Sequence, residues 1–124
     1  MASELGGQLA ELTSRLVQID SVNPPGDVTR VVEFIRNWLS ERGFSSSIYE
    51  YVKGKPNLIA RVGKGKPVII LNGHTDVVPP GDPGKWTHPP FSGKITEGKV
   101  YGRGSTDMKG GLAVIMMVFA DLGP

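Results

Sequence analysis

The sequence predicts an α/β domain in which helices cover both faces of a mixed sheet. Two amphipathic helical patterns open the chain, short segments with strand character fill its middle, and a long apolar segment of helical length closes it. This order of elements is typical of layered α/β domains. With 124 residues, 39% of them apolar and 21% charged, the chain is long enough for a domain with a hydrophobic core.

Two helices are predicted before residue 44. The first has apolar residues at helical spacing, and these are Leu5, Leu9, Leu12, Leu16 and Ile19. The segment "SVNPPGD" ends it, and Asp27 is placed to cap the second helix. The second helix has one broad apolar face made of Val31, Phe34, Ile35, Trp38 and Leu39. We expect Gly43 to end it in a left-handed conformation.

Strand patterns follow. "SIYEYV" (47–52) and "NLIARV" (57–62) flank a turn at residues 54–56. "VIIL" (68–71) is apolar on both faces, which predicts a central strand covered by helices. A Pro/Gly-rich loop occupies residues 77–93, and "KITEGKVYG" predicts a hairpin that turns at Glu97-Gly98. The last segment, 108–122, is apolar nearly all round and is predicted to be a buried helix.

Composition excludes several classes of function. The net charge is +2, but the basic residues are scattered and form no basic stripe with interleaved aromatics, so we expect no nucleic-acid partner. The chain has no cysteine, so any transition metal must be held by His, Asp or Glu. The N-terminus lacks the pattern of a signal peptide, and the longest apolar run is too short to span a bilayer. These features predict a cytoplasmic protein without a membrane partner.

Polar residues follow the apolar "VIIL" segment directly. His74 and Asp76 are two residues apart, so on a strand their side chains would point to the same side of the sheet. Open α/β sheets bind ligands at the carboxyl ends of their strands. A histidine can ligate a metal through one ring nitrogen while a carboxylate orients it through the other. The alternative is a polar strand end with a local hydrogen bond.

A second polar segment is "VYGRGSTDMKGG" (100–111), in which four glycines allow close approach of the backbone before a helix. Asp107 lies at the expected start of that helix, where an ordinary N-cap is the alternative to a functional role. Lys109 is expected to be a solvated lysine.

Together, "GHTDVVP" and "WTHPPFSGKITEGKVYGRGSTDMKGG" closely resemble the two N-terminal signatures of one family of zinc metallohydrolases. The family comprises acetylornithine deacetylase, succinyl-diaminopimelate desuccinylase, aminoacylase and carboxypeptidase G. "SVNPPGD" also matches a segment typical of this family, and the resemblance extends from about residue 5 to residue 122. It implies a catalytic domain like that of the zinc exopeptidases.

The resemblance also implies roles for three residues. His74 would ligate one of two zinc ions, Asp76 would orient His74, and Asp107 would bridge both ions. Cobalt or manganese could replace zinc in such a nitrogen- and oxygen-rich site. The implied reaction is hydrolysis of the amide bond of N-acyl amino acids or small peptides by water activated between the metals. His88 lies where the family pattern has no ligand, so we expect it to pack beside aromatic residues of its loop.

Family members are roughly three times as long as this chain, which by the usual domain size means two domains. Residues 1–124 would therefore form the N-terminal part of the catalytic domain. The rest of that domain, with the general base and the remaining ligands, and the second domain would be absent. We expect the 124 residues alone to be inactive and to self-associate, or to pair with the missing C-terminal part. The alternative is a non-catalytic remnant that acts as a stand-alone metal-binding or interaction domain.

Overall fold

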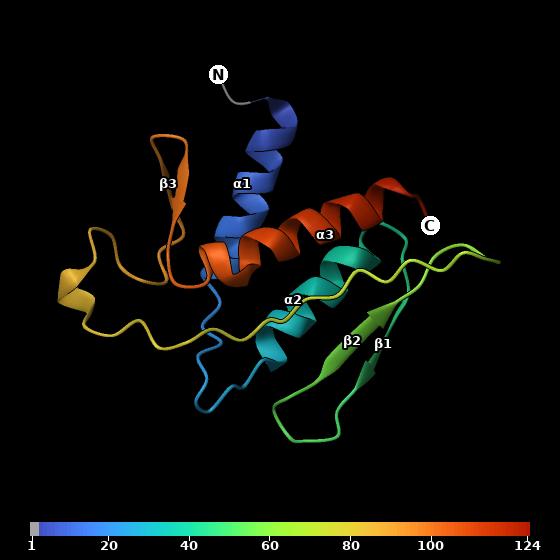
Figure 1. Cartoon of the computed structure of the whole chain (residues 1–124), viewed down its shortest axis with the longest axis horizontal. Coiled ribbons are helices and arrows are strands. Elements are labelled where there is room, and N and C mark those ends of the chain that lie inside the picture. Colours follow the sequence, from blue (N-terminus) through green and yellow to red (C-terminus); the bar gives the residue numbers. More distant parts are fainter. Residues whose placement is uncertain (1–2) are drawn as a thin grey trace.

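The computed structural model describes residues 3–124, which form three helices and two small antiparallel sheets. The helices are α1 (Glu4–Val17), α2 (Thr29–Ser40) and α3 (Gly110–Asp121). Figure 1 shows α3 crossing the end of α1 and lying above α2. None of these helices is both long and apolar enough to cross a membrane.

The helices pack on one core because each has an apolar stripe at helical spacing. Its buried residues come from all three helices and from the residues flanking α2, and are Leu12, Leu16, Val28, Val31, Val32, Ile35, Trp38, Leu39, Phe44, Leu112, Ala113 and Met116. The predicted apolar face of α2 is thus confirmed, with Phe34 partly buried. In α1, Leu12 and Leu16 are buried, whereas Leu5 is exposed and Ile19 lies beyond the end of the helix.

The ends of α2 follow the sequence prediction closely. The carboxylate of Asp27 accepts a hydrogen bond from the Thr29 amide at 3.0 Å, although Val28 is the residue at the N-cap position itself. Hydrogen bonds from the backbone and side chain of Thr29 lower the pKa of Asp27. Gly43 has a φ of 83°, the left-handed conformation expected just after the helix.

The predicted hairpin is present, and the two strands predicted around residues 54–56 form a second one, although they are shorter than predicted. Strands β1 (Ser46–Tyr49) and β2 (Asn57–Ala60) pair antiparallel and pack against α2. Strands β3 (Lys94–Thr96) and β4 (Lys99–Tyr101) pair antiparallel beside α1 (Figure 1). Their turn has positive φ at both Glu97 and Gly98, as a two-residue hairpin turn requires. The long loop before β3 contains one 3₁₀ turn, η1 (Pro83–Lys85).

The predicted central strand at residues 68–71 is wrong for this structure. The segment is extended, as the yellow-green trace in Figure 1 shows, but it pairs with no strand within residues 3–124. Its side chains are exposed, Ile69 and Ile70 to 81% each. Apolar patterning predicts burial only where neighbouring strands exist to cover both faces and to take the backbone hydrogen bonds. The described strands therefore form two separate pairs and no single mixed sheet.

The last helix is apolar but not buried all round. Leu112, Ala113 and Met116 face the core, whereas Val114 and Val118 are about half exposed. Before α3 the chain makes an irregular turn, η2 (Ser105–Lys109), in which Asp107 and Met108 leave helical φ/ψ values. The helix proper thus starts two residues later than predicted, which places Asp107 in the turn and not at the N-cap.

Candidate metal site

His74 and Asp107 meet although 33 residues separate them in the sequence. The Nε2 atom of His74 lies 3.0 Å from the Oδ1 atom of Asp107. Both side chains remain accessible, His74 to 50% and Asp107 to 85%. A ring nitrogen and a carboxylate oxygen therefore converge at a surface that a small ion can reach.

Asp76 contacts the other side of the same imidazole ring. Its Oδ1 atom lies 3.3 Å from the Nδ1 atom of His74, and its own backbone oxygen lies 3.1 Å from that nitrogen. Acceptors therefore face both ring nitrogens, Asp76 at Nδ1 and Asp107 at Nε2, and a proton on Nδ1 is the tautomer that suits a metal ligand at Nε2. That tautomer leaves the Nε2 lone pair free on the side of Asp107.

Close packing of glycines holds the two segments together. A Cβ atom on Gly73 would lie 2.9 Å from the Cε atom of Met108, and the His74 amide contacts the Met108 sulfur at 3.3 Å. Gly104 has a φ of 86°, and a Cβ there would lie 2.4 Å from the Val77 side chain. A larger residue at 104 would therefore push apart the segments that carry His74 and Asp107, whereas at 73 the flexible Met108 side chain could move aside.

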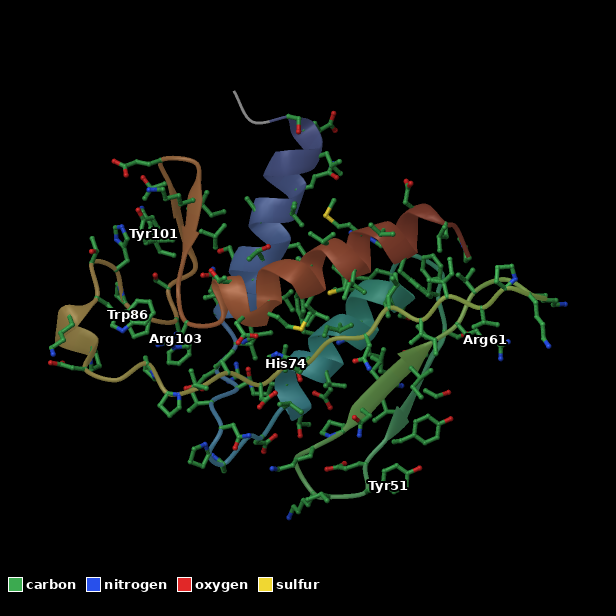
Figure 2. All side chains as sticks on the ribbon, in the orientation of Figure 1. Tyr51, Arg61, His74, Trp86, Tyr101 and Arg103 are labelled. Carbon is green, nitrogen blue, oxygen red and sulfur yellow. The ribbon has the colours of Figure 1, made fainter. Side chains whose placement is uncertain are left out.

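An open pocket of about 410 Å³ adjoins the site and is lined by His74, Asp76 and Asp107 on one side and by Trp86, Tyr101 and Arg103 on the other. The Arg103 guanidinium lies 5.2 Å from the centre of the Trp86 ring, and Figure 2 shows these two side chains close together near β3. The Trp86 indole in turn donates to the Pro80 oxygen at 3.0 Å. The pocket thus combines acidic, aromatic and cationic groups.

His88 stays outside the site. Its ring packs edge-on against Tyr101, with the ring centres 4.7 Å apart. This confirms the expectation that it packs beside an aromatic residue, although the partner is Tyr101 of β4 and not a residue of its own loop.

The expectation of a solvated Lys109 is wrong. Its side chain is fully buried, and its Nζ atom donates to the backbone oxygen of Ile19 at 2.7 Å. Burial lowers the pKa of the Lys109 ammonium from 10.5 to about 8, and the negative charge of Asp20 opposes this shift. Its long apolar stem fills space between α1 and the start of α3. Sequence patterns do not distinguish a lysine buried in this way from a lysine at the surface.

The donor set fits part of a site for a divalent cation. Ligand atoms at about 2.0 to 2.2 Å from a tetrahedral zinc lie roughly 3.4 Å from one another. The 3.0 Å between His74 Nε2 and Asp107 Oδ1 is close to that spacing, and oxygen and nitrogen donors suit zinc, cobalt or manganese. Across residues 3–124, however, no three His, Cys, Asp or Glu side chains are grouped so that all could hold one ion. Among these residues, His74 and Asp107 are the pair of side chains whose donor atoms could reach one ion together.

The chain is similar to known enzymes over most of its length. It is 45% identical over 109 residues to the succinyl-diaminopimelate desuccinylase of Methylorubrum extorquens (strain PA1), covering 85% of this chain and 28% of that protein. It is 49% identical over 105 residues to the enzyme of that name from Paracoccus denitrificans (strain Pd 1222), covering 84% and 27%. Residues 70–123 match the model of peptidase family M20/M25/M40. The chain belongs to this family.

The M20/M25/M40 assignment agrees with the fold. The structure matches that of an M20 family metallo-carboxypeptidase, Sso-CP2 from Sulfolobus solfataricus, with a TM-score of 0.82 over 93% of this chain and 27% of that one, at 21% sequence identity. This confirms the predicted α/β class. The chain spans about 28% of the length of the curated relatives it matches.

The three residues singled out from the sequence thus lie together, but sequence reasoning missed others. Asn23, to which the sequence patterns assigned no role of its own, donates from its side-chain amide to Asp76 Oδ2 at 3.2 Å. Arg103 lines the pocket, and its Nε atom is buried without a hydrogen-bond partner among residues 3–124. Both residues lie in the segments that carry the family resemblance, and this was the available signal.

Proposed function

We propose that this chain supplies two ligands, His74 and Asp107, to the metal site of an M20-type hydrolase. The observation that carries the proposal is the 3.0 Å contact between His74 Nε2 and Asp107 Oδ1, with Asp76 on the far side of the ring. In this proposal Asp107 bridges two zinc ions, and Asp76 fixes the tautomer of His74. Bound metal would polarise the scissile carbonyl and lower the pKa of the attacking water.

The reaction proposed for the whole protein is hydrolysis of the amide bond of an N-acyl amino acid or small peptide in the cytoplasm. Desuccinylases are the relatives that support this substrate class. Within residues 3–124 no third metal ligand accompanies His74 and Asp107. We therefore propose that residues 1–124 are the N-terminal part of a catalytic domain, and that the remaining ligands and the general base lie in sequence that pairs with it.

Zinc binding by the 124-residue chain tests the ligand assignment. Isothermal titration should detect one weak site in the unchanged chain, and His74→Ala or Asp107→Ala should each lower its affinity more than tenfold, because each removes a direct ligand. His88→Ala is the matched control, because this histidine packs on Tyr101 away from Asp76 and Asp107. The zinc affinity of this variant should equal that of the unchanged chain. Equal zinc affinity in all four proteins would refute the assignment.

Amine release from an N-succinyl or N-acetyl amino acid tests the proposed need for further sequence. The 124-residue chain with zinc should show no appreciable turnover, because loss of a general base alone costs roughly two to four orders of magnitude in rate. Appreciable turnover that Asp107→Ala abolishes would mean that these residues are sufficient for catalysis.

A further inference from the structure

The segment from Ile19 to Asn23 connects α1 to the loop before α2 and runs beside the candidate metal site. Val22 pairs in parallel with Val77, and two backbone hydrogen bonds secure this bridge. The Asn23 amide donates to the Val77 oxygen at 2.8 Å, and the Val77 amide donates to the Ser21 oxygen at 3.1 Å. The backbone just after Asp76 is thus fixed to the 19–23 segment.

Two side chains of this segment reach the residues between His74 and Val77. The Ser21 hydroxyl, itself almost fully buried, donates to the Thr75 oxygen at 2.7 Å. The Asn23 side-chain amide donates to Asp76 Oδ2 at 3.2 Å. Because an ionised carboxylate only accepts hydrogen bonds, the NH₂ group of Asn23 and not its oxygen must face Asp76.

The contact from Asn23 leaves Asp76 one carboxylate oxygen for His74. Oδ2 is occupied by Asn23, and Oδ1 lies 3.3 Å from His74 Nδ1. The terminal torsion of an aspartate is broad, so a free carboxylate would rotate away from a fixed alignment. The space beside Asn23 depends on Gly26, since a Cβ atom at that position would lie 3.0 Å from the Asn23 Cγ atom and would displace the side chain.

The same segment also contacts the other half of the site. Lys109, two residues after Asp107, donates from Nζ to the Ile19 oxygen at 2.7 Å and is fully buried. The 19–23 segment is therefore hydrogen-bonded to both chain segments that meet at the His74–Asp107 contact.

We propose that Asn23 is a positioning residue of the metal site, which orients the Asp76 carboxylate and, through it, the imidazole of His74. This inference rests on the proposed function, in which His74 ligates a divalent ion through Nε2. Partners that orient a metal-bound histidine typically contribute 10- to 100-fold to metal affinity. Because Asn23 acts one contact further out, the lower end of that range applies.

A purely structural role for Asn23 predicts a different result. As a residue of the loop before α2, it could stabilise the fold and leave the ring of His74 unaffected. Ser21→Ala is the matched control for this role, because it removes a hydrogen bond from the same segment to the same loop without touching the Asp76 carboxylate.

The test compares the 124-residue chain with its Asn23→Ala, Ser21→Ala and His74→Ala variants by zinc titration, with urea denaturation to record the stability of each. Asn23→Ala should weaken zinc binding about tenfold, while Ser21→Ala, at a similar loss of stability, should stay within about threefold of the unchanged chain. Equal zinc affinity in Asn23→Ala and Ser21→Ala would overturn the proposal.

A second measurement does not depend on metal. In an Asp107→Ala background, where Asp76 makes the polar contacts that remain to the ring among residues 3–124, the ¹⁵N shifts of His74 report its neutral tautomer, with His88 as an internal reference. Adding Asn23→Ala should reduce the fraction protonated at Nδ1, and adding Ser21→Ala should not. If zinc binding proves equal in the unchanged chain and in His74→Ala, the ligand assignment fails, and the tautomer measurement alone decides the role of Asn23. An unchanged tautomer would then refute that role.

Discussion

The buried Lys109 predicts an unusual dependence of stability on pH. Its pKa is about 8 in the folded chain and 10.5 when it is exposed in the unfolded chain. Between these two values the unfolded state binds more protons than the folded state, so the free energy of unfolding should rise with pH. Below pH 8 both states carry the proton, and the full cost of burying the charge is present.

Replacement by methionine isolates this effect. Met fills similar space without a charge, so Lys109→Met should abolish the rise. One pKa unit corresponds to about 1.4 kcal/mol, so the shift from 10.5 to about 8 sets an upper limit of about 3.5 kcal/mol. We expect about 2 kcal/mol, because relaxation and water penetration reduce the cost of a buried charge.

Urea denaturation of both proteins at pH 7, 8.5 and 10, followed by circular dichroism, measures the effect. Other lysines and tyrosines titrate in both proteins and largely cancel in the difference between them. The lost hydrogen bond to Ile19 adds only an offset that is independent of pH. The unchanged chain should gain stability relative to Lys109→Met as the pH rises. A difference that stays constant from pH 7 to pH 10 would refute the reasoning that Lys109 is desolvated.

Three further results are expected. In thermal denaturation, Gly104→Ala should lower the free energy of unfolding by roughly 2 kcal/mol or more, because the left-handed φ of 86° and the clash with Val77 both oppose a Cβ atom. Gly111→Ala is the control and should not destabilise the chain, because a Cβ atom there has ordinary contacts. Asp27→Asn should lower the melting temperature at pH 7 but not at pH 2. The pKa of Asp27 is lower in the folded chain than in the unfolded chain, so the ionised carboxylate stabilises the fold above its unfolded-state pKa. This stabilisation is lost as the pH falls through the folded-state pKa. Ile70→Lys should reduce self-association, measured by light scattering, without lowering the melting temperature, because Ile70 is 81% exposed. If the chain without this substitution is already monomeric at high concentration, the prediction is contradicted.

Local sequence signals predicted the local structure well. The hairpin turn at Glu97-Gly98, the apolar face of α2 and the left-handed Gly43 each depend on residues within a few positions of one another. The prediction of a strand at 68–71 was wrong because it depends on residues far away in the sequence. A central strand requires neighbours from distant sequence, and in this structure no strand pairs with it within the described residues.

In the candidate site, too, the features that depend on neighbouring residues were predicted from the sequence, and those that depend on distant residues were not. The spacing of His74 and Asp76 indicated that both could act on one site, but only the family resemblance connected them with Asp107, because nothing local links residues 33 apart. Asn23 and Lys109 could not be assigned from the sequence, since each acts through one contact with a distant residue. Lys109 is the clearer case, because a lysine is almost never fully buried and is normally solvated.

The exposed 68–71 segment also bears on how the site is held. If His74 depended on a paired strand for its position, exposure of that strand would leave the histidine free to move. The contacts that fix the histidine instead come from residues outside this segment. They are the Val22–Val77 bridge and the contact of the His74 amide with Met108. These contacts lie within the described residues and do not involve the apolar segment. The pairing of His74 with Asp107 is therefore a property of the loops and of the turn before α3, and it should persist in variants such as Ile70→Lys that change only the exposed 68–71 segment.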